Sequence, residues 1–307
     1  MSPEDILGLQ QEISILQALV GHEHIIRLYD TYMDPIYCFL VLEYMAGGDL
    51  IGRIVSLKKY TESDAIHVCR QMVKALEYCH DHKIAHRDIK LENILLATTE
   101  LDESKDEFTI TKIKLADFGF AARYPSSGKG VDHEQNQPGD EAQGGFKTQL
   151  GTPLYVAPEI LKGKKYDFSV DMWSLGVLMY ILLCGYPPFH NKDTQKLYKL
   201  ICSGQVTFQG KYWGAISNEA KQFIKALLTT EAKKRLTAKD ARSHPWLSSP
   251  QDQSSLLQSM SLTDVLVQER LRIFNARRKV RAAVYTVIAT NKFTSLGIQF
   301  HSAVIGV

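Results

Sequence analysis

The sequence predicts an α+β fold, with a few strands near the N-terminus and helices through most of the remaining chain. Residues 24–32 and 37–42 are short apolar and aromatic runs typical of strands, and the Asp34-Pro35 turn separates them. Apolar residues at helical spacing then dominate from about residue 61 to residue 246. The 307 residues are 45% hydrophobic, which is enough to bury a substantial core.

Composition argues against several classes of protein. The formal net charge is only +2, so no global field attracts nucleic acid or a membrane surface. The five cysteines are scattered without a C-x-x-C pair, which favours reduced thiols over a disulfide framework or a zinc site. No signal peptide is visible, and the apolar run at 175–184 is too short to span a bilayer. We therefore expect a cytoplasmic location, with a nuclear one left open.

Each expected element has a local signal. Ser2 and Pro3 followed by acids predict the start of a helix, and apolar residues continue it at Ile6, Leu9, Ile13 and Leu16. Residues 46–49 interrupt the pattern, and a helix is expected from Thr61 to about His82. Short strands at 94–96 and 113–115 flank an acidic loop. Residues 124–145, rich in Gly, Ser, Gln and Asp, are expected to be mobile.

The chemistry gathers in a loop that reads His86-Arg87-Asp88-Ile89-Lys90-Leu91-Glu92-Asn93. Asp88 can accept a proton from a substrate hydroxyl, Lys90 can contact a phosphate, and Asn93 offers an oxygen to a metal. Asp117, in Asp117-Phe118-Gly119, offers a carboxylate to the same hard cation. Taken alone, residues 86–88 could equally form a surface salt-bridge cluster.

With Asn93 at the right offset, Asp117-Phe118-Gly119 after a strand and Ala157-Pro158-Glu159 further on, the set is identified as the signature of protein kinases. Residues 1–247 resemble the calcium/calmodulin-dependent protein kinases. The resemblance implies a two-lobed kinase fold, with residues 1–43 as part of the small lobe and 44–247 as the large lobe. It also implies transfer of phosphate from ATP with Mg²⁺, held by Asn93 and Asp117, to serine or threonine in protein substrates.

The resemblance implies an ATP pocket with a gatekeeper, two hinge residues and a floor, which are Leu42, Glu43, Met45 and Leu95. Asp49 would reach the ribose, and Glu92 and Asp117 complete the ATP-binding set. Asp49 and Glu92 would also hold an arginine three residues before the target, which predicts substrates that are basic on their N-terminal side. Asp49 could equally be only a turn residue.

Further roles follow from the resemblance alone. Thr152 would hydrogen-bond the catalytic Asp and Lys, and Glu12 is the helix glutamate of the small lobe. Leu16, Leu28, His86 and Phe118 would stack as an apolar spine. Arg87 would pair with a phosphate that an upstream kinase adds at Thr148, although Thr148 could be a plain loop threonine. Asp171 would lie beneath the catalytic loop, and Arg235 would pair with Glu159.

The C-terminal part changes in composition at Ser248. Residues 248–262 are a polar linker, 263–293 a basic amphipathic helix and 294–307 a tail. The basic helix resembles the autoinhibitory, calmodulin-binding segment of the same kinases, which implies contacts with calcium-loaded calmodulin through Arg277, Arg278, Lys279, Val280, Val284, Val287 and Phe293. A membrane-surface helix or a solvated helix packed on the kinase are the alternatives.

Two kinase motifs are not found in the 307 residues: a G-x-G-x-x-G loop over the phosphates and a strand lysine in V-A-I-K. We therefore expect an incomplete small lobe from an N-terminally truncated sequence. The alternative function is a catalytically dead, calmodulin-binding docking module. Intact Asp88, Lys90, Asn93 and Asp117 favour the enzyme, because a docking module has no chemical need for all four.

Overall fold

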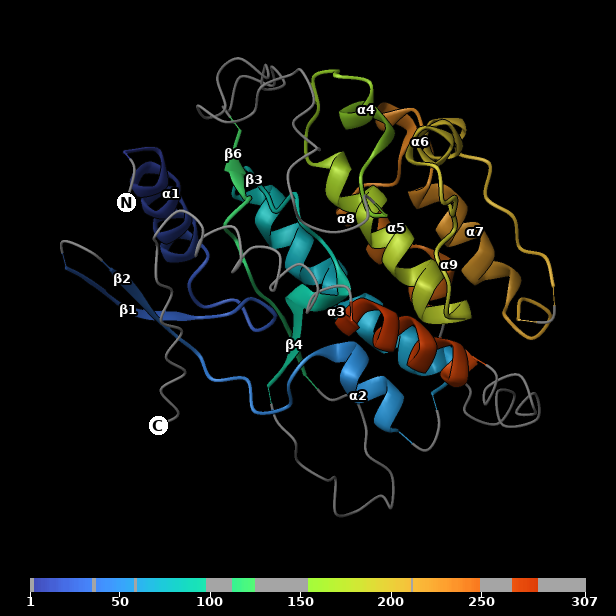
Figure 1. Cartoon of the computed structure of the whole chain (residues 1–307), viewed down its shortest axis with the longest axis horizontal. Helices are drawn as coiled ribbons and strands as arrows, with labels where there is room; N and C mark the ends of the chain where they lie inside the picture. The colour runs from blue at the N-terminus through green and yellow to red at the C-terminus, as the bar shows by residue number, and fades with distance from the viewer. Residues whose placement is uncertain are drawn as a thin grey trace.

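The computed structural model in Figure 1 describes part of the chain, with side chains from Ile6 onward. The described ranges are 3–34, 37–57, 60–97, 112–124, 154–210, 212–248 and 267–280. They fold into a small strand-containing part on the left of Figure 1 and a larger helical part on the right. This agrees with the expected two-lobed α+β fold.

The small lobe consists of one helix and one hairpin among the described residues. Helix α1 (Pro3–Ala18) precedes strands β1 (Leu28–Met33) and β2 (Cys38–Leu42), which pair in antiparallel fashion. The outer face of this hairpin exposes Tyr32, Phe39 and Val41. This two-stranded lobe with an uncovered apolar face fits the expected incomplete small lobe.

The elements that carry residues 86–93 and 117–119 come next and are built from short strands around one long helix. Helix α3 (Glu62–Asp81) begins with a capping box, in which Thr61 and Asp64 exchange hydrogen bonds. The surrounding elements are α2 (Leu50–Ser56), β3 (Ile84–Ala85), η1 (Leu91–Asn93), β4 (Ile94–Leu96), β5 (Ile113–Leu115) and β6 (Ala122–Arg123). β3 pairs with β6 and β4 with β5, both antiparallel. These pairings bring residues 86–93 and 117–119 to the same place.

The rest of the large lobe packs around α5 (Ser169–Cys184), which is buried along nearly its whole length. The other elements are α4 (Pro158–Leu161), α6 (Thr194–Ser203), α7 (Asn218–Leu227), η4 (Ala232–Lys234), α8 (Ala238–Arg242) and α9 (Pro245–Ser248). The predicted pair of Arg235 with Glu159 is present and buried, with Nη1 and Oε1 2.6 Å apart. Within the described residues, no helix is both long and apolar enough to cross a bilayer.

Residues 267–280 form one further helix, drawn in red in Figure 1, which runs beside α2. Val267 and Leu271 are buried in its inner face. Gly185, at the end of α5, lets the helix approach closely: a Cβ there would lie 2.5 Å from Arg270 Cβ. The basic helix predicted from the sequence therefore packs on the large lobe over the part that is described.

Some predicted boundaries were wrong. The strand expected at 24–32 begins only at Leu28, because Ile26 donates its backbone N–H to Leu115 O, away from the hairpin. Helix α2 and the short β3–β6 pair carried no sequence signal that predicted them. The segment expected to be mobile, 124–145, lies outside the described residues except for Tyr124.

Candidate active site

A buried carboxylate fixes the backbone of the catalytic loop. Asp171 accepts hydrogen bonds from the backbone N–H groups of His86 at 2.9 Å and Arg87 at 2.8 Å. Arg87 has a left-handed backbone, with φ of +66°, which is unfavourable for a residue with a side chain. Burial alone would raise the pKa of Asp171, but a hydrogen bond from His80 holds that pKa below its ordinary value. The ionised carboxylate therefore stabilises the strained loop.

Asp88, Lys90 and Asn93 lie in mutual hydrogen-bonding contact. Lys90 Nζ lies 2.5 Å from Asp88 Oδ2, and Asn93 Nδ2 lies 3.0 Å from the same oxygen. Asn93 Nδ2 also donates to the backbone oxygen of Asp88 at 2.9 Å. Because its amide nitrogen is used in this way, Asn93 is left with its oxygen as an acceptor that could face a cation.

Asp117 offers a second oxygen donor of the kind that hard cations prefer. It has a left-handed backbone, with φ of +65°, and lies two residues after the end of strand β5. Glu12 of α1 lies nearby, since carboxylate oxygens of both residues lie within 4 Å of the position of a Cβ on Gly119. Burial, and then the charge of Asp117, raise the pKa of Glu12. A divalent cation would relieve this repulsion.

The oxygen donors fit a magnesium site that is completed by water and phosphate, and do not fit a site in which protein side chains alone surround the metal. Mg²⁺ is usually held by one or two protein oxygens together with waters and substrate phosphates, and Asn93 and Asp117 match that pattern. Among the described residues, no three His, Cys, Asp or Glu side chains are grouped to hold a metal by themselves. A metal in this site would therefore depend on the phosphates of a nucleotide.

Glu43, one of the two predicted hinge residues, forms an ion pair with a buried lysine that the sequence did not predict. Lys114 of β5 is 8% exposed and its Nζ lies 2.8 Å from Glu43 Oε2. Lys114 Nζ also donates to Ile25 O at 3.2 Å. Met45 and Leu95 are half-buried beside this point, whereas Leu42 is exposed. The predicted floor and hinge thus lie together around the strand that leads to Asp117.

The C-terminal helix places an arginine on the predicted substrate-binding carboxylates. Arg278, 16% exposed, contacts Asp49 Oδ2 through Nη2. Its Nη1 lies 3.5 Å from Glu92 Oε1, and Asn275 Oδ1 accepts from both its Nε and Nη2. Asp49 and Glu92 therefore bind an arginine of the same chain, which fits the pairing expected from the sequence.

Polar and aromatic contacts anchor the rest of this helix. Gln268 Nε2 donates to Leu57 O at 3.0 Å, in a buried position. The Arg270 guanidinium carbon lies 4.8 Å from the ring centre of Tyr212 and 5.5 Å from that of Tyr186. In contrast, Arg277, Lys279 and Val280 point away from the body and are exposed, Val280 at 65%. The helix thus presents a second, basic face to solvent.

The comparison with protein families agrees with this geometry. The family model described as "Protein kinase domain" matches residues 3–247. The chain belongs to the protein kinase domain family. This confirms the prediction made from residues 86–93 and 117–119.

Several curated relatives of this kinase domain are calcium/calmodulin-dependent protein kinases. The chain is 36% identical over 296 residues to the type II alpha chain of Drosophila melanogaster, and the match covers 96% of the chain and 50% of that protein. It is 40% identical over 241 residues to the type 1 kinase of Caenorhabditis elegans, covering 78% of the chain and 62% of that protein. The type II delta subunit of Oryctolagus cuniculus is 36% identical over 296 residues, with the same coverage as the Drosophila protein.

These relatives support the resemblance inferred from the sequence. The chain spans only 50% to 62% of the length of these kinases. The activity, substrates and partners of those whole kinases are therefore only proposals for this chain.

Five of the residues predicted from the sequence fall outside the part of the chain that the structure describes. Thr148, Thr152, Val284, Val287 and Phe293 lie outside the described residues. The predicted spine is partly visible, with Leu16, Leu28, His86 and Phe118 buried and the rings of His86 and Phe118 4.6 Å apart. Arg87, predicted to bind a phosphate, donates to Phe120 O and to Tyr166 Oη.

Sequence reasoning missed the residues that hold the hinge and the C-terminal helix. Lys114 carried one available signal, because a lone lysine inside an apolar strand next to Asp117 is unusual and needs a partner. Gln268, Tyr186 and Tyr212 carried none, because their contacts join segments distant in sequence.

Proposed function

We propose that this chain is the catalytic and regulatory part of a serine/threonine protein kinase controlled by calcium and calmodulin. The observation that carries the proposal is the contact of Arg278 with Asp49 and with Glu92, which belongs to the same loop as Asp88. A kinase that inhibits itself is expected to combine an intact catalytic loop with a basic helix whose arginine occupies the place of a substrate arginine.

The chemistry assigned to the site is transfer of the γ-phosphoryl group of ATP. Asp88 orients the substrate hydroxyl and accepts its proton, and Lys90, 2.5 Å from Asp88, is placed to stabilise negative charge on the transferred group. Asn93 and Asp117 would hold Mg²⁺, which supplies charge neutralisation of the phosphates. Met45 and Leu95 would contact the adenine, and Asp49 the ribose. Thr152 would hydrogen-bond Asp88 and Lys90.

Substrate choice follows from the same carboxylates. Asp49 and Glu92 would bind an arginine three residues before the target serine or threonine. Arg278 holds these carboxylates while the helix is docked, so a basic substrate must displace it. The proposed substrates are therefore protein segments that are basic on their N-terminal side.

Calcium-loaded calmodulin is the proposed activator. The exposed Arg277, Lys279 and Val280 offer a basic and apolar face that an acidic, apolar groove could bind first. Capture of this face and of Val284, Val287 and Phe293 would then pull Arg278 away from Asp49. The proposed boundaries are 1–43 and 44–247 for the lobes, 248–262 for the linker, 263–293 for the regulatory segment and 294–307 for the tail.

Two further proposals concern the cellular setting. An upstream kinase would phosphorylate Thr148, and Arg87 would receive the phosphate after giving up its bonds to Phe120 and Tyr166. A cytoplasmic location, with a nuclear one open, fits the unpaired cysteines; Cys38, Cys69, Cys79, Cys184 and Cys202 are all free thiols.

The rival function is a docking module that binds calmodulin without phosphoryl transfer. The observation that favours it is that no G-x-G-x-x-G loop and no V-A-I-K lysine occur in the 307 residues. Under this reading Asp88 and its neighbours would be retained for packing. The exposed basic face of the 267–280 helix suits either function.

The deciding experiment is phosphate transfer from labelled ATP to a basic serine peptide, with Mg²⁺ and Ca²⁺-calmodulin. We expect transfer by the purified chain and none by Asp88→Asn, whose amide cannot accept the proton. Transfer that is undetectable or equal in Asp88→Asn, with calmodulin binding intact, would reject phosphoryl transfer by this polypeptide in favour of the docking module.

A further inference from the structure

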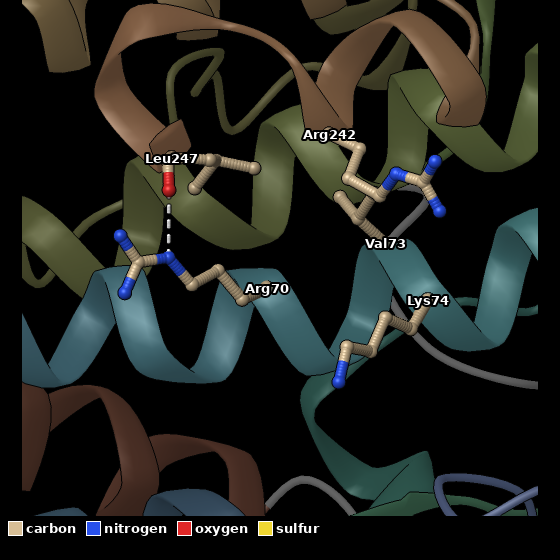
Figure 2. A pocket seen from close by; sticks show the side chains of 5 residues that line it. All are labelled: Arg70, Val73, Lys74, Arg242 and Leu247. Atoms are coloured by element: carbon tan, nitrogen blue, oxygen red, sulfur yellow. Dashed lines mark hydrogen bonds between the residues drawn. The ribbon is translucent and has the colours of Figure 1, made fainter. Parts of the chain in front are cut away.

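A depression lies where α3 meets α8 and α9, built from residues that take no part in the proposed active site. Its volume is about 190 Å³, and Arg70, Val73, Lys74, Arg242 and Leu247 line it (Figure 2). Three of the five lining side chains are cations and none is an acid. The combination of positive charge and apolar surface points to a ligand that carries both carboxylates and an apolar group.

The floor of this depression is apolar and fixed. Val73 and Leu247 are buried, and the aliphatic stem of Arg70 lies beside Leu247 in Figure 2. Arg70 Nε donates to Leu247 O at 2.7 Å, which joins α3 to α9. Because this bond already orders the Arg70 side chain, a ligand need not immobilise it on binding. The floor has room for one large apolar side chain.

The rim of the depression is charged, and its cations form ion pairs with acidic residues of the same chain. Lys74 Nζ lies 3.3 Å from Glu23 Oε1, and Arg242 Nη1 lies 3.1 Å from Glu77 Oε2. The side chains of Lys74 and Arg242 are 53% and 63% exposed, so these ion pairs contribute little to stability. Glu23 is 54% exposed, so an incoming carboxylate could replace it on Lys74 at small cost, whereas Glu77, 17% exposed, would stay beside Arg242 while a ligand carboxylate used the remaining N–H groups of that guanidinium.

We propose that this depression binds an acidic segment of a partner protein. One leucine-like side chain would enter between Val73 and Leu247, and carboxylates on either side of it would pair with Lys74 and Arg242. The apolar floor distinguishes this ligand from a free phosphate or a nucleic acid backbone, neither of which offers an apolar anchor. The site would recruit a partner to the large lobe whether or not the chain transfers phosphate.

The test uses the full chain and a fluorescent peptide with one leucine flanked on each side by two glutamates. Fluorescence anisotropy should show saturable binding that weakens as salt rises. The double variant Lys74→Glu/Arg242→Glu should weaken binding by about tenfold or more, because both rim contacts become repulsive. The matched control Lys196→Glu/Lys199→Glu makes the same change in charge on two exposed lysines of α6 and should bind like the unchanged chain.

A second peptide, with glycine in place of the leucine, tests the apolar anchor. It should bind about tenfold more weakly, as expected from the loss of one buried aliphatic side chain. The proposal is overturned if the leucine peptide does not bind, if both double variants bind it equally, or if the glycine peptide binds as well. Displacement of the peptide by inorganic phosphate at equal concentration would also overturn it, since it would mark a site for anions in general.

Discussion

Arg278 contacts Asp49 across 229 positions of the sequence and fixes the C-terminal helix over the part of the large lobe that precedes the catalytic loop. The same guanidinium reaches Glu92, one residue before the predicted metal ligand Asn93. One side chain of the 267–280 helix thus contacts both carboxylates that are proposed to recognise the substrate. This contact leads to a direct prediction.

Replacing Arg278 should release the proposed inhibition. A partly exposed ion pair contributes about 1 kcal/mol, so Arg278→Gln should raise phosphorylation without calmodulin by about fivefold. The rate of phosphate transfer to a basic peptide in the presence of a calcium chelator measures this. Arg277→Gln is the matched control, because Arg277 is the exposed neighbour and should leave that basal rate unchanged. Equal basal rates in the two variants would contradict the assignment.

Gly185 should control docking of the whole helix. A Cβ at this position would lie 2.5 Å from Arg270 Cβ and 3.2 Å from the backbone nitrogen of Leu271. Gly185→Ala should therefore increase hydrogen exchange across residues 267–280. Gly163→Ala is the control, because Gly163 also has a positive φ, of +60°, but nothing lies within 4 Å of its Cβ position.

Both glycine variants should lose about 1 kcal/mol of stability from backbone strain. Only Gly185→Ala should change exchange in the C-terminal helix. If the two variants exchange alike over 267–280, then Gly185 does not hold the helix in solution.

Lys114 and Glu43 should behave as a coupled pair in the free energy of unfolding. Lys114→Met leaves the Glu43 carboxylate without its buried cation and should cost about 3 kcal/mol. Adding Glu43→Leu removes that stranded charge, so the double variant should recover part of the loss. Denaturant unfolding of the single and double variants measures this. Additive losses would show that the two side chains do not interact.

The loss of folding stability at acidic pH should depend on His22. Burial, followed by the charge of His24, lowers the pKa of His22 from 6.5 to about 4. A proton on His22 therefore favours the unfolded chain, and the stability that the neutral ring provides is full above pH 6.5 and declines as the pH falls towards 4. His22→Asn should flatten the dependence of the midpoint temperature on pH across that window.

His82→Asn is the control for losing a ring beside Tyr78, since the rings of His22 and His82 lie 4.7 Å and 4.2 Å from it. If His22→Asn keeps the same slope as the unchanged chain, another group causes the acid loss.

The parts of the fold that the sequence predicted are those with local causes. The capping residues at Thr61 and Asp64 predict the start of α3, and apolar runs predict β4 and β5 at their observed bounds. The loop at 86–93 is encoded in eight consecutive residues. Such signals act within one turn or one strand, so they can be read without knowing the tertiary structure.

The parts that were missed depend on contacts between distant segments. Strand β3 exists because Ile84 and Ala85 pair with Arg123 and Ala122, and neither dipeptide carries a strand signal alone. The first strand was predicted to begin too early because His24 O accepts from Leu115 N–H and Ile26 N–H donates to Leu115 O, which the local pattern cannot indicate. The sequence likewise predicted a pair of carboxylates at Asp49 and Glu92 without indicating that Arg278 would occupy them.

The central claim is that Asp49 and Glu92 form an arginine site which Arg278 fills until calmodulin removes it. The most direct measurement compares phosphorylation of two peptides, one with arginine and one with alanine three residues before the serine, each with Ca²⁺-calmodulin and with chelator. We predict that the arginine peptide is strongly preferred and that calmodulin raises its rate. Equal rates for the two peptides, or a rate unchanged by calmodulin, would contradict the account.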